Sequence, residues 1–213
     1  LDKFFTPRPK VDWPAHSAMS SHDALMVASG ITTVLDAVAI GDVRDGGDRL
    51  ENLEKMINAV EETQKRGLNR AEHRLHLRCE LPHHTTLPLF EKLVDREPVT
   101  LVSLMDHSPG QRQFANREKY REYYQGKYQL SGEQMERFEE EQMALAAAWS
   151  QPNRQAIAAM CRERQIALAS HDDATHEHVA ESHQLGSVIA EFPTTLAAAQ
   201  ASRQHGMNVL MGA

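Results

Sequence analysis

Three strand-like segments of the chain end in side chains of the kinds that bind catalytic metal ions. Residues 74–80 end on Glu80, residues 99–107 end on His107, and residues 166–173 carry His171 followed by two aspartates. The apolar runs before these side chains are typical of strands in a parallel sheet covered by helices. Because α/β barrels carry their chemistry at the carboxyl ends of such strands, this pattern predicts a metal site.

A hydrolytic metal site needs imidazole or carboxylate ligands, an open coordination position and a water molecule whose pKa the cation lowers. Glu80, His107 and His171 are therefore the candidate metal ligands. For any one of the 12 histidines a purely structural role is an equal alternative, but three coincidences at strand ends favour a site. Since side chains alternate along a strand, Cys79 and Asp106 should point away from it.

Asp172 and Asp173 directly follow His171 and are the candidate catalytic groups. Their carboxylates could orient a water molecule or the ring of a ligating histidine. The alternative is structural, because a carboxylate just before a helix interacts favourably with the helix dipole.

A polar stretch directly after His107 indicates that the substrate is a small anionic molecule. Pro109 and Gly110 predict a turn, and arginine and amide side chains after it are suited to hold phosphate oxygens. The candidate substrate-binding residues are Gln111, Arg112, Gln113, Lys119, Tyr123 and Lys127. Residues 112–127 carry net positive charge within an acidic chain. A solvated helix face with packed tyrosines is the alternative.

Strand and helix patterns alternate about six times along the chain, which predicts a parallel sheet with right-handed crossovers. A (β/α)8 barrel of the TIM type, incomplete in this chain, is favoured over a doubly wound sheet, because no glycine-rich phosphate loop follows a strand. We expect one domain over residues 1–213, with a helical insertion around 115–150. In that insertion the Ser131 capping box opens a helix to about Trp149, and Asn153 caps the next helix.

The composition narrows the class of protein and its partners. A formal net charge of −7 argues against a general nucleic-acid binder, because such proteins neutralise phosphates with lysine and arginine. The longest apolar stretches are only strand-sized, and the first residues are no signal peptide, so we expect no membrane partner and a cytoplasmic location. Cys79 and Cys161 are expected to be free and buried. The apolar stretch before Trp149 is a candidate interface for self-association.

Six segments along the whole chain resemble one known family. They are residues 1–14, the Arg-Cys-Glu of 78–80, Ser-Leu-Met-Asp-His-Ser-Pro-Gly-Gln-Arg-Gln-Phe of 103–114, Tyr-Tyr-Gln-Gly-Lys of 123–127, Ala-Ser-His-Asp-Asp of 169–173, and Glu-Phe-Pro-Thr-Thr of 191–195. The resemblance is to the metal-dependent diphosphatases of bacterial phosphonate breakdown, a family of the amidohydrolase superfamily.

The resemblance implies a phosphoanhydride hydrolase that cleaves the 5-triphosphate of ribose 1-methylphosphonate and leaves the 5-phosphate plus pyrophosphate. It also implies a divalent metal, with zinc expected first and manganese or iron as alternatives. In the family pattern His107 and His171 match metal-ligating histidines, and Glu80 matches the bridging carboxylate. Arg112 and its neighbours would then face the triphosphate.

The family's first metal motif, His-x-Asp, would precede Leu1, and its general-base aspartate would follow Ala213. We therefore expect the chain to be part of a longer protein, and a product of these 213 residues alone, with a mass near 24 kDa, to be inactive. Two other functions fit the residues: hydrolysis of a C–N bond, as in amidohydrolases and deaminases, and a non-catalytic domain that binds a sugar phosphate.

Overall fold

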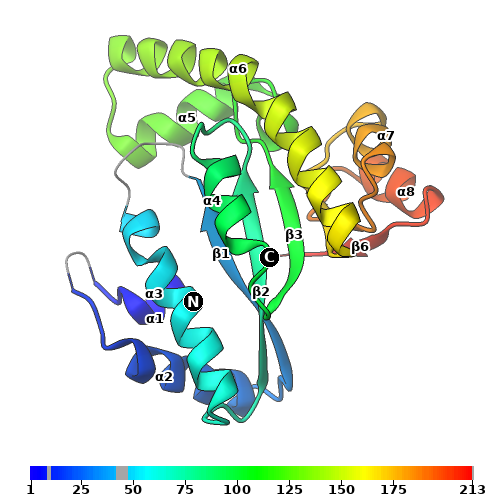
Figure 1. Ribbon diagram of the computed structural model, residues 1–213. Coiled ribbons are helices and arrows are strands. Elements are labelled where there is room, and N and C mark those ends of the chain that lie inside the picture. The colour runs from blue at the N-terminus through cyan, green and yellow to red at the C-terminus, as the bar shows by residue number, and fades with distance from the viewer. Residues whose placement is uncertain (9–10, 42–47, 213) are drawn as a thin grey trace.

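In the part of the chain that the structure describes, six parallel strands form one sheet in the order of the sequence, from β1 at one edge to β6 at the other. The computed structural model describes residues 1–8, 11–41 and 48–212 (Figure 1). Pro9 and Lys10 of the N-terminal motif lie outside them. The strands are β1 (Thr33–Ile40), β2 (Glu72–Glu80), β3 (Val99–Met105), β4 (Ala167–His171), β5 (Ile189–Glu191) and β6 (Asn208–Leu210). The prediction of a parallel α/β fold is confirmed.

Helices connect consecutive strands, as parallel pairing requires. Among the described residues these connecting helices are α3 (Asp48–Lys65), α4 (Thr86–Leu93), α5 (Arg117–Tyr128), α6 (Gly132–Arg164), α7 (His176–Gln184) and α8 (Leu196–Gln204), with a 3-10 turn, η1 (Arg112–Phe114), before α5. Two further helices, α1 (Asp2–Phe5) and α2 (Ala15–Ala28), precede β1. No helix among the described residues is long and apolar enough to cross a membrane.

One face of the sheet is apolar and carries the main core. The strand register places Val38 beside Leu77, Leu77 beside Val102, and Val102 beside Leu168. These side chains pack with residues of α2, α3, α4 and α6 in one hydrophobic cluster. The strands form because β-branched and leucine side chains at alternate positions can be buried under amphipathic helices.

The opposite face is polar along its middle strands. His76, Arg78 and Glu80 alternate with the core residues of β2, and Ser103 and His171 lie on the same face of β3 and β4. The sheet therefore separates two environments, an apolar layer under the helices and a polar face that leads to the carboxyl edge.

The predicted break near Trp149 is wrong, because α6 continues through Pro152 as one helix of 33 residues. Asn153 does not cap a second helix: its side-chain amide donates to the backbone carbonyls of Leu81 (2.8 Å) and His83 (3.1 Å). These hydrogen bonds hold the middle of the helix against the end of β2. The predicted capping box at Ser131 is present.

Gly41, which follows β1, is required by its surroundings, because its φ is +83° and a Cβ would lie 2.2 Å from Thr86 Oγ1. We predict that Gly41→Ala lowers the free energy of unfolding by about 2 kcal/mol or more, through strain and overpacking. Gly126→Ala is the matched control, because this helical glycine has open space around it and alanine is favoured there. Equal effects in urea unfolding would contradict the assignment.

Candidate metal centre

Glu80, His107, His171 and Asp172 meet at the carboxyl edge of β2, β3 and β4. Glu80 accepts a hydrogen bond from the His107 backbone N–H (3.1 Å), and its second oxygen lies 2.6 Å from His107 Nδ1. Asp172 Oδ2 lies 3.4 Å from His171 Nε2 and 3.8 Å from His107 Nε2. The predicted ligands are thus brought together, and Asp172 joins them.

A cavity of about 470 Å³ opens beside these side chains. Its lining residues come from β2, from the segments after β3, β4 and β5, and from the end of the described chain: Arg78, His107, Gln113, His171, Asp172, Phe192, Pro193, Thr194, Met211 and Gly212. His107, His171 and Asp172 each offer a ligand atom, and these atoms lie within 4.8 Å of one another. The group is therefore compact enough to bind a cation and faces a space that a substrate could enter.

Carboxylates surround the half-buried imidazole of His107. Burial opposes protonation of His107, but the Glu80 and Asp172 carboxylates outweigh it and raise the pKa of His107 to about 10. A positive charge at this position is therefore stabilised by the surrounding carboxylates, and a bound cation would experience the same field.

The backbone turns sharply where β4 and β5 enter the site. Asp172 and Phe192 directly follow these strands with φ of +56° and +57°. Aspartate tolerates this left-handed region, whereas it is uncommon for a bulky residue such as phenylalanine. The Asp172 N–H donates to the Glu191 carbonyl, and the Phe192 N–H donates to the Leu210 carbonyl, both at 2.9 Å. The turns place Asp172 beside His171 at the cavity.

Two polar residues absent from the predicted site contact His171. Arg78 Nη2 donates to His171 Nε2 at 3.0 Å, and Glu191 Oε2 lies 2.8 Å from His171 Nδ1. Both belong to motifs of the family resemblance, and Arg78 lies two residues before Glu80, on the same face of β2. Strand alternation from Glu80 would have found Arg78, whereas no local pattern connects Glu191 with His171.

The alternation argument for the neighbouring residues is confirmed. Cys79 is fully buried in the apolar cluster, and burial raises the pKa of its thiol. Asp106 points away from His107 and accepts hydrogen bonds from Arg154 and Ser108.

Arg112 is placed differently from the prediction that it faces a substrate. Its side chain is 2% exposed and forms ion pairs with Asp173 and with Glu181, the latter at 3.0 Å. Arg154 joins this group through Glu181 (3.4 Å). The physical reason is charge compensation, because a buried guanidinium needs carboxylate partners. Asp173 is likewise committed to Arg112 and lies outside the cavity lining.

The other predicted substrate-binding residues are spread over the surface near the site. Gln113 lines the cavity, whereas Gln111 lines a neighbouring cavity bounded by α6. Lys119 is exposed on α5, and Tyr123 on the same helix is half-exposed. Lys127 Nζ lies 5.5 Å from the centre of the Tyr123 ring. The structure therefore brings one of these six residues to the cavity.

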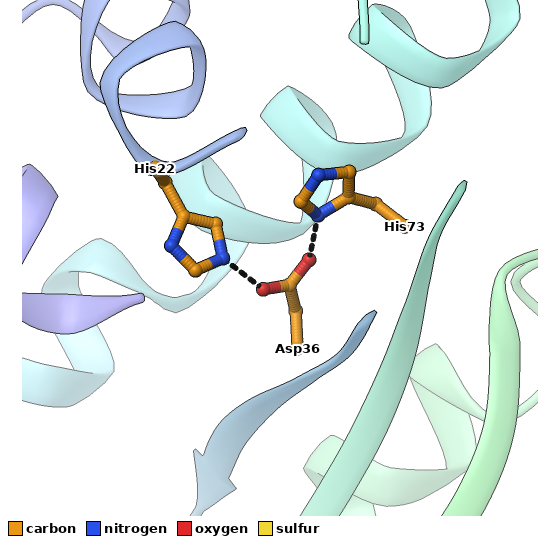
Figure 2. A group of neighbouring side chains, drawn as sticks. All are labelled: His22, Asp36 and His73. Atoms are coloured by element: carbon orange, nitrogen blue, oxygen red, sulfur yellow. Dashed lines mark hydrogen bonds and ion pairs between the residues drawn. The ribbon is translucent and has the colours of Figure 1, made fainter. Parts of the chain in front are cut away.

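A second group of histidines and an aspartate lies away from the cavity, under α2 (Figure 2). His22 Nε2 and His73 Nδ1 both contact the Asp36 carboxylate, at 2.6 and 2.7 Å. All three side chains are buried on the helix-covered side of β1 and β2. Sequence reasoning missed this cluster, because the three residues belong to three elements with no shared spacing.

Positive charges on His73 and Arg70 compensate the carboxylates of this second cluster. Asp23 lies 3.4 Å from His73 Nε2 and accepts hydrogen bonds from Arg70 and from the Ala71 backbone. Although burial opposes it, Asp36 and Asp23 raise the pKa of His73 above its usual value. A protonated His73 and Arg70 offset the two carboxylates. We therefore interpret the group as a hydrogen-bonded clasp between α2, β1 and β2.

Fold and site together define a parallel α/β protein with a candidate divalent-metal centre at the carboxyl edge of its sheet, an arrangement suited to hydrolysis. The chain is 90% identical over 213 residues to alpha-D-ribose 1-methylphosphonate 5-triphosphate diphosphatase (PhnM) of Escherichia coli (strain K12). It spans 56% of the length of that relative. No family model matches the sequence. The relative confirms the resemblance that the six motifs indicated.

The clasp predicts a specific pH dependence of stability. Burial opposes ionisation of Asp36, but hydrogen bonds from His22 and His73 lower its pKa below 3.8. The contribution of ionised Asp36 to stability is present above pH 3.8 and is lost as the pH falls through its lowered pKa. The contribution of protonated His73 to stability is present below pH 6.5 and is lost as the pH rises through its raised pKa. The stability gap between wild type and Asp36→Asn should be largest between about pH 4 and 6.5.

Urea unfolding of the complete protein from pH 4 to 9 measures this gap. Asp12→Asn is the control, because Asp12 makes an exposed ion pair with Lys55 and should contribute little. A gap that stays constant or widens above pH 7 would be inconsistent with a protonated His73.

The buried position of Arg112 gives a second prediction. Arg112→Ala should destabilise the protein by about 3–5 kcal/mol, because Asp173 would remain buried without its partner. Replacing both residues together, as Arg112→Met with Asp173→Asn, should recover part of that loss in chemical denaturation. If Arg112→Ala leaves the stability unchanged but raises the KM for triphosphates, Arg112 binds the substrate instead.

Proposed function

We propose that this chain forms the metal-binding part of a diphosphatase of phosphonate catabolism. The enzyme would cleave the 5-triphosphate of ribose 1-methylphosphonate and release pyrophosphate, leaving the 5-phosphate. The observation that carries this proposal is the 90% identity to the Escherichia coli diphosphatase over the 213 residues of the chain. The proposed substrate is the one that the name of that relative states.

We also propose that the sheet is part of a (β/α)8 barrel in a single domain, with the helices around residues 115–150 as an insertion. Two observations support it. The main apolar core lies on one face of the sheet, whereas a doubly wound sheet carries helices on both faces. The other face carries His76, Arg78 and Ser103, which would line the barrel interior. A cytoplasmic location and self-association through α6 stay predictions.

The donor set at the carboxyl edge fits a divalent cation. Glu80, His107 and His171 would hold it, since imidazole and carboxylate groups suit zinc, manganese or iron. When bound, such a cation acts as a Lewis acid that polarises a phosphoryl oxygen and makes water more acidic. The His107 and His171 Nε2 atoms lie beside the Asp172 carboxylate at the cavity, which supports these two histidines as ligands. Glu80 lies 2.6 Å from His107 Nδ1, and its role as a ligand follows from the family resemblance.

The remaining side chains at the cavity would bind and orient the triphosphate. Among the described residues that line it, Arg78 alone carries a permanent positive charge, and its Nε is buried without a hydrogen-bond partner. Gln113 adds an amide donor. Asp172 is better placed than Asp173 to accept or orient a proton, since it faces both histidines. A general base beyond the described residues, as the family pattern implies, would complete the site.

The test is an assay of the complete protein with zinc or manganese and ribose 1-methylphosphonate 5-triphosphate. We expect stoichiometric release of pyrophosphate, and loss of turnover in His107→Asn and His171→Asn variants whose thermal unfolding remains cooperative. Turnover of cyclic amides but not of triphosphates would instead establish C–N hydrolysis. If the protein binds the sugar phosphate but binds no metal and shows no turnover, the non-catalytic alternative holds.

Arg78→Ala provides a test of substrate binding. Removing this cation should raise the KM for the triphosphate by about tenfold or more, because charged hydrogen bonds contribute about 1.5–3 kcal/mol. Arg137→Ala is a suitable control, because Arg137 is exposed on α6 and lies outside the cavity lining. Equal KM values for the two variants would remove Arg78 from the proposed binding site.

A further inference from the structure

A row of hydrogen-bonded, buried polar side chains lies next to His171 on the polar face of the sheet. Glu191 Oε2 lies 2.8 Å from His171 Nδ1 and accepts the hydroxyl of Ser103 at 2.8 Å. Ser103 Oγ in turn lies 2.5 Å from His76 Nε2. These residues lie on β5, β3 and β2, and their exposed fractions are 5%, 0% and 5%. These hydrogen-bonded side chains thus extend across the sheet from β5 to β2, next to the candidate metal centre.

The donors and acceptors of this row can be assigned one by one. The carboxylate of Glu191 is the common acceptor, because its Oε2 lies 2.8 Å from both His171 Nδ1 and Ser103 Oγ. An ionised carboxylate only accepts, so Ser103 O–H and His171 Nδ1–H must both donate to it. Ser103 Oγ then accepts from His76 Nε2–H. Burial lowers the pKa of His76 to about 4, which keeps its ring neutral and fits this role.

This assignment determines which nitrogen of His171 is available at the cavity. With Nδ1 protonated, Nε2 carries the lone pair. Arg78 Nη2 already donates to that atom at 3.0 Å, and Asp172 Oδ2 lies 3.4 Å away. Nε2 is therefore the atom that faces the cavity with ligand character, and the network behind the ring prevents the opposite tautomer.

We propose that Glu191, assisted by Ser103 and His76, is a positioning residue that holds His171 in the Nδ1–H tautomer and directs Nε2 toward the metal. The inference rests on the proposed function only in taking His171 as a ligand. Partners of this kind orient ligating histidines and increase their basicity. A network that only filled the interior would have no effect on the tautomer of His171.

The experiment uses the complete protein and has two readouts that do not depend on turnover. The first is the 15N chemical shift of the His171 ring in metal-free protein, assigned by comparison with His171→Asn. The second is zinc affinity, measured by competition with a chromophoric chelator. Wild type should show the Nδ1–H tautomer. Glu191→Ala should show a mixture of tautomers and a zinc affinity reduced about 10- to 100-fold.

Glu191→Gln separates positioning from loss of packing. Its amide oxygen can still accept from Nδ1–H, so the tautomer should be retained and the affinity largely restored. Ser170→Ala is the matched control, because Ser170 is a buried serine next to His171 whose hydroxyl has no hydrogen-bond partner among the described residues. It should change neither readout.

Three results would overturn the inference: an Nε2–H tautomer in wild type, a Glu191→Ala variant with unchanged tautomer and affinity, or equal losses in Ser170→Ala. The wild-type tautomer is determined without the Glu191→Ala variant, so the test stands even if Glu191→Ala does not fold. Zinc binding without triphosphate turnover would contradict the proposed function but leave this inference intact. Turnover of the triphosphate together with an unchanged tautomer and zinc affinity in Glu191→Ala would support the proposed function but contradict this inference.

Discussion

The structure depends on the alternation of side chains along the six parallel strands that its described residues form. Because successive residues point to opposite faces, the same strands supply Leu77 and Val102 to the core under the helices and Arg78 and Ser103 to the polar face. Burial of the apolar row provides the main free energy of folding. The carboxyl ends of the strands then lie at one edge of the sheet. This arrangement brings Glu80, His107 and His171 together, and the site does not need contacts among these three residues in order to form.

The buried charges show how the fold tolerates so many polar groups. On the helix-covered side, Asp36 and Asp23 surround His73, and Arg70 completes the balance. Behind the site, Arg112 and Asp173 neutralise each other. The group of His107, His171 and Asp172 instead lines the cavity at the carboxyl edge of the sheet. The contrast separates side chains that stabilise the fold from those that are available to a ligand.

The sequence predicted the parallel sheet and the strand-end ligands because both follow from local pattern: apolar runs, alternation, and a polar residue at the end of each run. It could not predict the role of Arg112, because its partner Asp173 lies 61 residues away in the chain. The clasp of His22, Asp36 and His73 and the contact of Glu191 with His171 are equally non-local. The length of α6 was missed because Pro152 normally breaks a helix, whereas here Asn153 anchors it to β2.

The most direct test is a crystal structure of the complete protein grown with zinc or manganese, with the metal located by anomalous scattering. We predict a peak in contact with Glu80, His107 and His171, beside the cavity that Arg78 and Gln113 line. A peak located instead at His22, Asp36 and His73, or no peak within reach of His107 and His171, would contradict the assignment of the metal centre.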